Sequence, residues 1–231
     1  MLIHRKLFHM NFDFDLITFD CYGTLIDWEG GIATAFQTEA AQDGLSLDRE
    51  QIIKAYMEEE PAVEIASYRA YREVLAETAS RVAARLGWRI NDDRAAFLPG
   101  SLPAWQPFDD TNAALERLAR RFQLGILSNT DDELFRATAR HFTVKFDLIV
   151  TAEQVRSYKP GFAHFQEGLA RAGESRMLHA AQSYFHDVVP ASKLKIPVIW
   201  VNRKSERAFE GGPQPSAEVS NLRELADLLG A

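Results

Sequence analysis

FDLITFDCYGTLIDW, residues 14–28, ends an apolar run in one carboxylate, Asp20, and continues into a turn at Gly23. An apolar run of this length, bounded by a turn residue, predicts a buried strand over 14–19. In open parallel sheets, ligands bind outside the carboxyl ends of the strands. The position of Asp20 directly after the run therefore predicts that its carboxylate faces a ligand site.

Strand and helix patterns alternate along most of the chain. Such alternation is typical of a parallel sheet with helices on both faces, so we predict an α/β fold with a Rossmann-like, doubly wound parallel sheet as its core. Besides 14–19, strands are expected at 123–127, 146–150, 179–182 and 197–201, and helices at 111–121, 162–172 and 221–229.

The interval 28–101 departs from this alternation, because it contains helical patterns and is poor in strand patterns. We therefore predict an α/β core domain of residues 1–27 and 102–231 and an inserted all-helical domain of residues 28–101. The inserted helices are expected at 31–43, 48–59, 62–86 and 91–98, with breaks at Gly44, Pro61, Gly87 and Pro99-Gly100.

Charge and composition argue against several kinds of partner. Lys and Arg number 26 against 33 Asp and Glu, a formal net charge of -7 that disfavours a nucleic-acid surface. No apolar run approaches the roughly 20 residues of a membrane helix, and residues 1–12 lack the pattern of a signal peptide. The single cysteine, Cys21, cannot form an intramolecular disulfide, so we expect a cytoplasmic protein without a membrane or nucleic-acid partner.

Four polar sets follow predicted strands or precede predicted helices. They are Asp20 to Thr24, Ser128-Asn129, Lys159 within SYKP, and Asp187 within YFHDVVPA. Because the carboxyl ends of parallel strands lie at one edge of a sheet, we predict that these sets converge on one site.

In this order, the four sets resemble the motifs of the haloacid dehalogenase superfamily. FDCYGTL, LSN, YKP and the acidic residue ahead of PVIWVNR carry the resemblance, which spans residues 14–203. The inserted helices resemble the cap domain of that superfamily, and the first motif, followed by a D-W pair, is closest to the L-2-haloacid dehalogenases. The resemblance implies a hydrolase of carbon-halide bonds that acts on a small 2-haloalkanoic acid through an aspartyl-ester intermediate, which water then hydrolyses.

The resemblance and the side-chain chemistry together suggest catalytic roles. Asp20 is the expected covalent nucleophile, and Lys159 supplies a fixed positive charge that offsets repulsion between carboxylates. Asp187 is expected to pair with Lys159 and to orient the hydrolytic water. Thr24 offers a hydroxyl to hold a carboxylate.

A second group of residues is expected next to the substrate. Ser128 and Asn129 offer a hydroxyl and an amide to an anionic group, and His186 is a lesser candidate for a base. Cys21 occupies a position where a small thiol is usually packed, so we do not expect it to act as a nucleophile. The residues predicted to surround the substrate are Cys21, Tyr22, Ser128, Asn129, Arg72, Tyr184 and His186.

Tyr22 distinguishes between two reactions of the superfamily. Its phosphatases resemble one another in having a second Asp two positions after the nucleophile, which protonates the leaving alcohol. A phenol with an ordinary pKa of about 10 replaces that acid poorly, whereas a halide leaves without needing a proton. We therefore predict a dehalogenase that needs no metal or cofactor. The alternatives are a Mg2+-dependent phosphatase, another hydrolase of the superfamily and a member that only binds ligands.

The expected substrate shell departs from the dehalogenase pattern. Those enzymes use an arginine of an early cap helix, where this chain has Lys54, with Arg69 and Arg72 in the next predicted helix. A smaller haloacetate, including fluoroacetate, or a strained ring opened by the same attack are therefore open alternatives as substrates. The dehalogenase positions for a tyrosine, a serine and an asparagine hold Phe165, Gln182 and Tyr184.

The resemblance also implies a homodimer.

Overall fold

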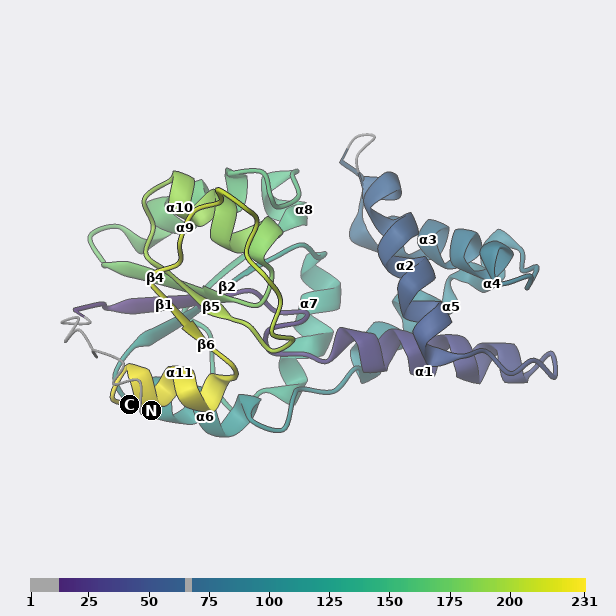
Figure 1. Cartoon of the computed structure of the whole chain (residues 1–231), viewed down its shortest axis with the longest axis horizontal. Helices are drawn as coiled ribbons and strands as arrows, with labels where there is room; N and C mark the ends of the chain where they lie inside the picture. The colour runs from purple at the N-terminus through teal and green to yellow at the C-terminus, as the bar shows by residue number, and fades with distance from the viewer. Residues whose placement is uncertain (1–12, 65–67) are drawn as a thin grey trace.

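The computed structural model describes residues 13–64 and 68–231, which form two groups in space (Figure 1). One group is a sheet with helices on both faces, and the other is a set of helices beside it. The signal-peptide prediction concerns residues 1–12, which lie outside the described residues. No helix in the described part of the chain is long and apolar enough to cross a membrane.

The described residues form one six-stranded sheet in which all neighbouring strands are parallel. The strand order is β3-β2-β1-β4-β5-β6, so β1 lies near the centre. The predicted α/β fold with a doubly wound parallel sheet is therefore confirmed. The strands are β1 (Leu16–Phe19), β2 (Gln123–Ser128), β3 (Leu148–Thr151), β4 (Met177–Ala181), β5 (Val198–Val201) and β6 (Ala217–Val219).

Helices cover both faces of this sheet. They are α6 (Thr111–Leu118), α7 (Asp132–Thr138), α8 (Ala152–Val155), α9 (Ala163–Ala172), α10 (Val189–Lys193) and α11 (Leu222–Leu228). Figure 1 shows α6 and α11 together on one face and α9 and α10 on the other. All four residues of β1 are buried, and they alternate between the faces: Ile17 and Phe19 pack in one apolar cluster, whereas Leu16 packs in another with Phe165 of α9.

Strand β6 was not predicted from the sequence. Its three residues include the exposed Glu218 and follow the glycine- and proline-containing segment 211–216, so they carry no clear strand pattern. Parallel pairing with β5, in which Ala217 lies opposite Ile199, makes the segment a strand. The fourth strand also begins earlier than predicted, at Met177, because it pairs along the whole of β1.

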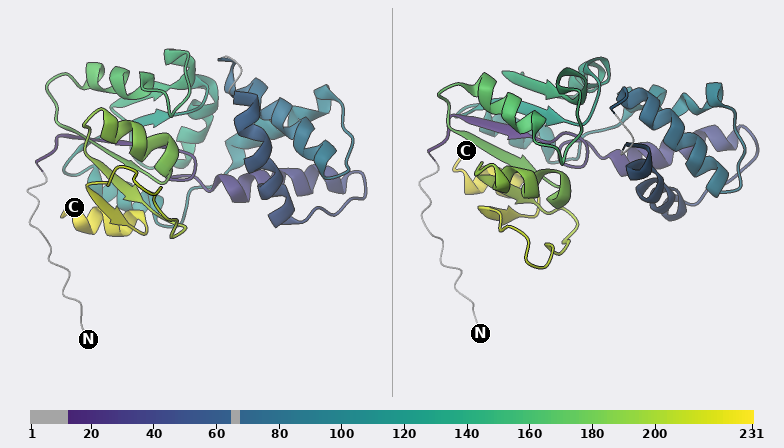
Figure 2. Two further views of the ribbon diagram at one scale, coloured as in Figure 1. Left: turned by 45° about the horizontal axis from the view of Figure 1, so that its top comes forward. Right: turned by 90° about the horizontal axis from the view of Figure 1, so that it is seen from above.

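The interval after β1 is helical throughout its described elements. These are α1 (Trp28–Ala41), α2 (Arg49–Glu64), α3 (Tyr71–Arg85), α4 (Asp92–Ala95) and α5 (Phe97–Ser101). Figures 1 and 2 show this group beside the sheet, at the side toward which β1 runs. That the group forms a separate domain with boundaries at residues 28 and 101 stays a prediction.

Four helix predictions in this interval were wrong in detail. α1 begins at Trp28 instead of 31, because the Asp27 side chain accepts a hydrogen bond from the amide of Gly30 and caps the helix. α2 continues through Pro61 to Glu64, since Pro61 lies exposed, where solvent can replace the lost backbone hydrogen bond. The helix predicted for 62–86 consequently begins only at Tyr71, and that predicted for 91–98 is divided between α4 and α5.

Candidate active site

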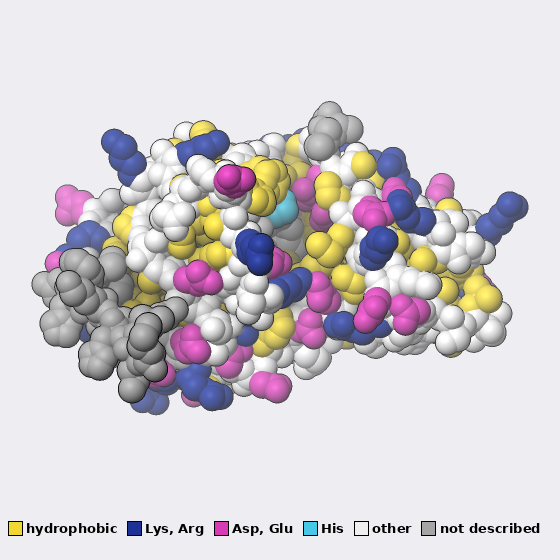
Figure 3. Space-filling view, in the orientation of Figure 1, with side chains coloured by type: hydrophobic (Ala, Val, Ile, Leu, Met, Phe, Trp, Pro, Cys, Tyr) yellow, Lys and Arg dark blue, Asp and Glu magenta, His cyan; other side chains and the backbone are white. Residues whose placement is uncertain are grey.

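A cavity of about 330 Å³ lies between the carboxyl ends of the central strands and helices α1 to α3. Figure 3 shows that the molecule is hollowed between the sheet group and the helical group. All four polar sets predicted from the sequence reach this cavity. Its lining includes Asp20, Ser128, Asn129, Lys159 and Asp187 from the sheet group, and Trp28, Tyr56, Glu60, Glu64 and Tyr71 from the helical group.

Asp20 follows the last residue of β1, and its carboxylate is held at both oxygens. Thr24 Oγ1 donates a hydrogen bond to Asp20 Oδ2 at 2.9 Å, and Lys159 Nζ donates to Asp20 Oδ1 at 2.8 Å. The turn that returns Thr24 to Asp20 contains Gly23 at φ +100°, a conformation that other residues rarely adopt. Burial raises the pKa of Asp20 above its ordinary value, and the charge of Lys159 opposes that rise.

Lys159 is 1% exposed, and its ammonium group uses all three protons. Lys159 Nζ donates to Asp20 Oδ1, to Asp187 Oδ1 at 2.7 Å and to the carbonyl oxygen of Leu127 at 2.8 Å. Burial opposes the charged form, but the carboxylates of Asp187 and Asp20 outweigh it and raise the pKa of Lys159. The ammonium is therefore a permanent positive charge between two carboxylates.

The backbone around Lys159 is fixed by Asn129. The amide of Lys159 donates to Asn129 Oδ1 at 2.7 Å, and Asn129 Nδ2 donates to the Lys159 carbonyl at 3.1 Å. This reciprocal pair connects the residue after β2 to the lysine loop. Asn129 thus holds the lysine in position in addition to bordering the cavity.

Asp187 lies in the π-helical turn η3 (Tyr184–Val188) and is fully buried. Its Oδ1 accepts hydrogen bonds from Lys159 and from His179 Nε2 at 3.0 Å, while Oδ2 has no partner among the described residues. Burial opposes ionisation, but Lys159 and His179 together lower the pKa of Asp187 to about 2. Asp187 is therefore ionised at neutral pH, with one oxygen free to accept a hydrogen bond.

Tyr22 borders the cavity but does not present its hydroxyl as an acid. The Tyr22 hydroxyl shares a hydrogen bond of 2.8 Å with Thr138 Oγ1 of α7, and the ring packs edge-on against Trp105 at 5.9 Å. Burial raises the pKa of the phenol well above its ordinary value. The side chain two positions after Asp20 thus stays protonated, and its hydroxyl is held by Thr138.

Tyr184 and His186 both line the cavity, as expected for substrate contacts. The hydroxyl of Tyr184 is directed away, because it donates to the Pro213 carbonyl at 2.6 Å. His186 Nδ1 lies 3.1 Å from Ser183 Oγ, and burial lowers the pKa of His186, so the imidazole is neutral at neutral pH. Ser128 Oγ is fully buried at the cavity and has no hydrogen-bond partner in the described part of the chain.

Two residues predicted to contact the substrate do not line this cavity. Cys21 is fully buried behind Asp20, and burial raises the pKa of its thiol well above the ordinary value. Arg72 is half-exposed at the start of α3, where it pairs with Asp131 at 3.3 Å and Glu133 at 2.8 Å. The N-terminal position on α3 directs Arg72 toward these two acids, so the cap arginine suggested by the resemblance does not reach the cavity.

The chain matches a family of known hydrolases. Residues 14–181 match the family model described as haloacid dehalogenase-like hydrolase. The chain belongs to this family. The family assignment inferred from the sequence motifs is therefore confirmed.

Relatives of this haloacid dehalogenase-like hydrolase include halide- and phosphate-releasing enzymes by name. (S)-2-haloacid dehalogenase H-109 of Pseudomonas putida is 25% identical, over 92% of this chain and 96% of its own. Glyceraldehyde 3-phosphate phosphatase of Methanothermobacter thermautotrophicus is 26% identical, over 52% of this chain and 58% of its own.

A solved structure shares the fold over almost the whole chain. The L-2-haloacid dehalogenase of Xanthobacter autotrophicus, solved with chloropropionic acid covalently bound, superposes with a TM-score of 0.82 at 19% identity. The match covers 94% of this chain and 99% of the other. At this identity the likeness establishes the fold of the hydrolase.

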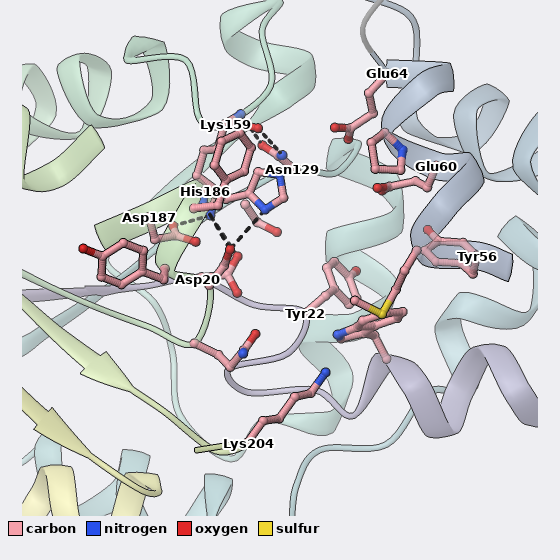
Figure 4. Close-up of a pocket in the computed structure, with 18 of the residues that line it drawn as sticks. Asp20, Tyr22, Tyr56, Glu60, Glu64, Asn129, Lys159, His186, Asp187 and Lys204 are labelled. Carbon is pink, nitrogen blue, oxygen red and sulfur yellow. Dashed lines mark hydrogen bonds and ion pairs between the residues drawn. The ribbon is translucent and has the colours of Figure 1, made fainter. Parts of the chain in front are cut away.

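The sequence motifs did not indicate several polar residues of this hydrolase site. His179 lies inside β4, where its Nδ1 contacts Thr18 Oγ1 of β1 at 2.9 Å, and the only signal was a polar side chain within an apolar run. Glu60 and Glu64 lie one helical turn apart on α2 and point into the cavity (Figure 4). In the sequence they belong to a run of acidic residues that is typical of a solvated helix face.

Proposed function

We propose that the protein is a hydrolase that displaces halide from a small 2-haloalkanoic acid, with Asp20 as the covalent nucleophile. The observation that carries the proposal is the state of Asp20: a carboxylate held by Thr24 and Lys159 at the floor of a cavity. Figure 4 shows Asp20, Lys159 and Asp187 together there. A carboxylate next to a permanent ammonium remains available for attack at neutral pH.

The first step needs no acid. A carboxylate oxygen of Asp20 attacks the halogen-bearing carbon, the new C–O bond forms, and the halide leaves with the electron pair of the broken carbon–halogen bond. Lys159 offsets the charge of Asp187 and of an anionic substrate close to the nucleophile. The raised pKa of Tyr22 is compatible with this step, because no proton has to be delivered at that position.

The second step opens the ester formed on Asp20. Water attacks the carboxyl carbon of Asp20, releases the 2-hydroxy acid and regenerates the carboxylate. Asp187 has a buried Oδ2 without a partner among the described residues, and this oxygen is suited to orient that water. The neutral imidazole of His186 also borders the cavity and is the candidate to accept the proton of the water.

A Mg2+-dependent phosphatase is the second candidate, supported by the named phosphatase relative. The residues present fit that chemistry poorly. Lys159 Nζ lies between Asp20 Oδ1 and Asp187 Oδ1, and the described residues contain no group of three or more His, Cys, Asp and Glu side chains placed to hold a metal ion. Tyr22 also replaces the acid that a leaving alcohol requires.

A single turnover in heavy-oxygen water tests the nucleophile. With enzyme in excess over 2-chloropropionate, the heavy oxygen is expected in Asp20 and not in the first lactate formed. Asp20→Asn should stop halide release, while Asp109→Asn, at an exposed aspartate, should not. Heavy oxygen in the lactate of the first turnover would disprove the covalent route, and Mg2+-dependent release of phosphate from phosphate esters would favour the phosphatase.

Location and assembly remain predictions at this point. We propose a cytoplasmic location, in keeping with the single cysteine, and a homodimer, which the resemblance to the L-2-haloacid dehalogenases implies. Sedimentation equilibrium of the full chain tests the dimer directly, because a monomer mass of 26.1 kDa should double.

A further inference from the structure

The cavity has an acidic wall that the proposed reaction does not use. Glu60 and Glu64 project from α2, and Figure 4 shows both carboxylates directed toward the side of the cavity that holds Asn129 and Lys159. Neither glutamate makes an ion pair with any described residue, whereas the neighbouring Glu59 pairs with Arg85 at 2.7 Å on the outer side of α2. Two carboxylates of one helix thus border a partly enclosed space without a counter-charge of their own.

The groups that face this pair are mostly uncharged. Tyr56 of α2 and Tyr71 of α3 approach Glu60, and their hydroxyl oxygens lie 3.4 Å apart. Lys159 is the cation that interacts with Glu64, and its three protons are already donated to Asp20, Asp187 and Leu127. The other cations of the lining are two exposed residues: Lys204, paired with Glu29, and Arg207.

The pKa values of both glutamates reflect the lack of an ion-pair partner. Burial raises the pKa of Glu60 to about 7, against hydrogen bonds from Tyr56 and Tyr71. Burial and the charge of Glu60 raise the pKa of Glu64 to about 9. A cation placed between them would favour the ionised form of both, so the pair would release protons when such a ligand binds.

A separate observation points to a ligand at the opposite wall. Ser128 Oγ is fully buried, borders the same cavity and has no hydrogen-bond partner in the described chain. A buried hydroxyl without a partner is costly, and a ligand oxygen would satisfy it. The cavity therefore offers a donor for an anionic group on the sheet side and two carboxylates on the α2 side.

We propose that the substrate of this site carries a protonated amine, and that Glu60 and Glu64 bind this amine. The same substrate also carries a carboxylate and the carbon that Asp20 attacks. The substrate class is a small amino acid with a leaving group. This inference rests on the proposed function for the attacked carbon, but the amine recognition is a binding property that can be measured without any turnover.

The first experiment compares two unreactive ligands of the same size. β-Alanine and butanoate differ by an ammonium in place of a methyl group. Titration calorimetry on the full chain should give β-alanine at least ten-fold tighter binding, on the order of 1.4 kcal/mol. At neutral pH its binding should release protons, detected as an enthalpy that depends on the ionisation enthalpy of the buffer.

Variants assign the preference to the pair. Glu60→Gln, Glu64→Gln and the double variant keep the shape of the side chains and should reduce the ratio of the two affinities toward one, and the double variant should abolish proton release. Glu59→Gln is the matched control on the outer side of α2, because Arg85 keeps Glu58 as a partner. Equal affinities in the wild type, or an equal loss of both ligands in the double variant, would overturn the proposal.

Turnover separates this inference from the proposed function. Chloride release from 3-amino-2-chloropropanoate should exceed release from the isosteric 2-chlorobutanoate at least ten-fold in kcat/KM, with Asp20→Asn as the background. If neither compound releases chloride but the preference for β-alanine holds, halide displacement fails and amine recognition stands. If 2-chlorobutanoate is the better substrate, amine recognition fails and halide displacement stands.

Discussion

The two walls of the cavity differ in whether their carboxylates have ion-pair partners. On the sheet side, Asp20 and Asp187 share the ammonium of Lys159 at 2.8 and 2.7 Å. On the α2 side, Glu60 and Glu64 have no ion-pair partner among the described residues, and burial raises the pKa values of both. Ion pairs on the sheet side fix the positions of the side chains that a reaction needs. Carboxylates without an ion-pair partner can instead bind a cationic group of a ligand.

The largest effect should come from removing the shared cation. Lys159→Met leaves two carboxylates buried without a counter-charge. Breaking a buried ion pair in this way typically lowers the free energy of unfolding by about 3–5 kcal/mol. Halide release should fall by about a thousand-fold, because the positive charge next to the proposed nucleophile Asp20 is lost. Denaturant unfolding and chloride release measure the two effects.

The exposed Lys145 provides the control for that change. Lys145→Met removes the same charge from the surface and should alter neither quantity measurably. If Lys159→Met kept near wild-type turnover, the sheet wall would not be the catalytic one, and the comparison of the walls would fail.

Asp187→Asn should have the second largest effect. The amide keeps the size of the side chain but has no negative charge, so it accepts the hydrogen bonds of Lys159 and His179 less well. We therefore expect about a hundred-fold loss of turnover. Rapid-quench measurements should show the ester on Asp20 accumulating, because water orientation is impaired. A loss confined to ester formation would contradict the role in the second step.

Asp187 also predicts a pH effect on stability. Its pKa is lowered to about 2 in the folded protein from an ordinary value of 3.8, so its stabilising contribution is present above pH 4 and is lost as the pH falls toward 2. The size of this contribution is about 2 kcal/mol. Acid unfolding followed by circular dichroism should be less steep in Asp187→Asn over that window; equal slopes would contradict the assignment.

Tyr22→Phe should have a small effect. The phenol donates no proton in the proposed reaction, and the change removes one hydrogen bond to Thr138 of about 1 kcal/mol. Turnover should therefore remain within about five-fold of the wild type in chloride-release assays. A loss of a hundred-fold or more would show that the hydroxyl acts as an acid after all.

Arg72→Gln should have the smallest effect. Arg72 is half-exposed and pairs away from the cavity with the exposed Glu133, a kind of pair that contributes about 1 kcal/mol or less. The buried Asp131, its other partner, keeps the hydrogen bonds from the backbone amides of Tyr71 and Arg72 when the guanidinium is removed. KM for a haloacid should therefore not change. If Arg72 bound the substrate carboxylate as the dehalogenase arginine does, its loss would raise KM. A large rise in KM would show that the α2–α3 wall rearranges to bring Arg72 inward.

The sequence predicted the sheet wall well because its signals are local. An apolar run that ends in Asp20 and turns at Gly23 places a carboxylate at a strand end whatever the rest of the chain does. The same holds for Ser128 and Asn129, which end and follow β2. Weak strand patterns were misjudged, and β6 shows why: three residues with one exposed glutamate become a strand only through a neighbour.

The α2 wall was not predictable in the same way. Glu58, Glu59, Glu60 and Glu64 have similar sequence surroundings, yet two of them pair with Arg85 on the outside and two face the cavity. Which of the four glutamates face the cavity depends on how α2 is rotated about its own axis relative to the sheet. The outward direction of Arg72 has the same origin, since it depends on how α3 meets the acids at the start of α7.

Local pattern and order along the chain thus decided the fold class, the position of Asp20 at a strand end and that of Lys159 in its loop, because strand ends and motif order do not depend on distant contacts. The packing of distant elements decided which acids share the ammonium, that His179 contacts Asp187, and that Glu60 and Glu64 face the cavity. The physical reason is that burial and pairing, which set the charge state of each group, arise only when segments far apart in the chain come within a few ångströms.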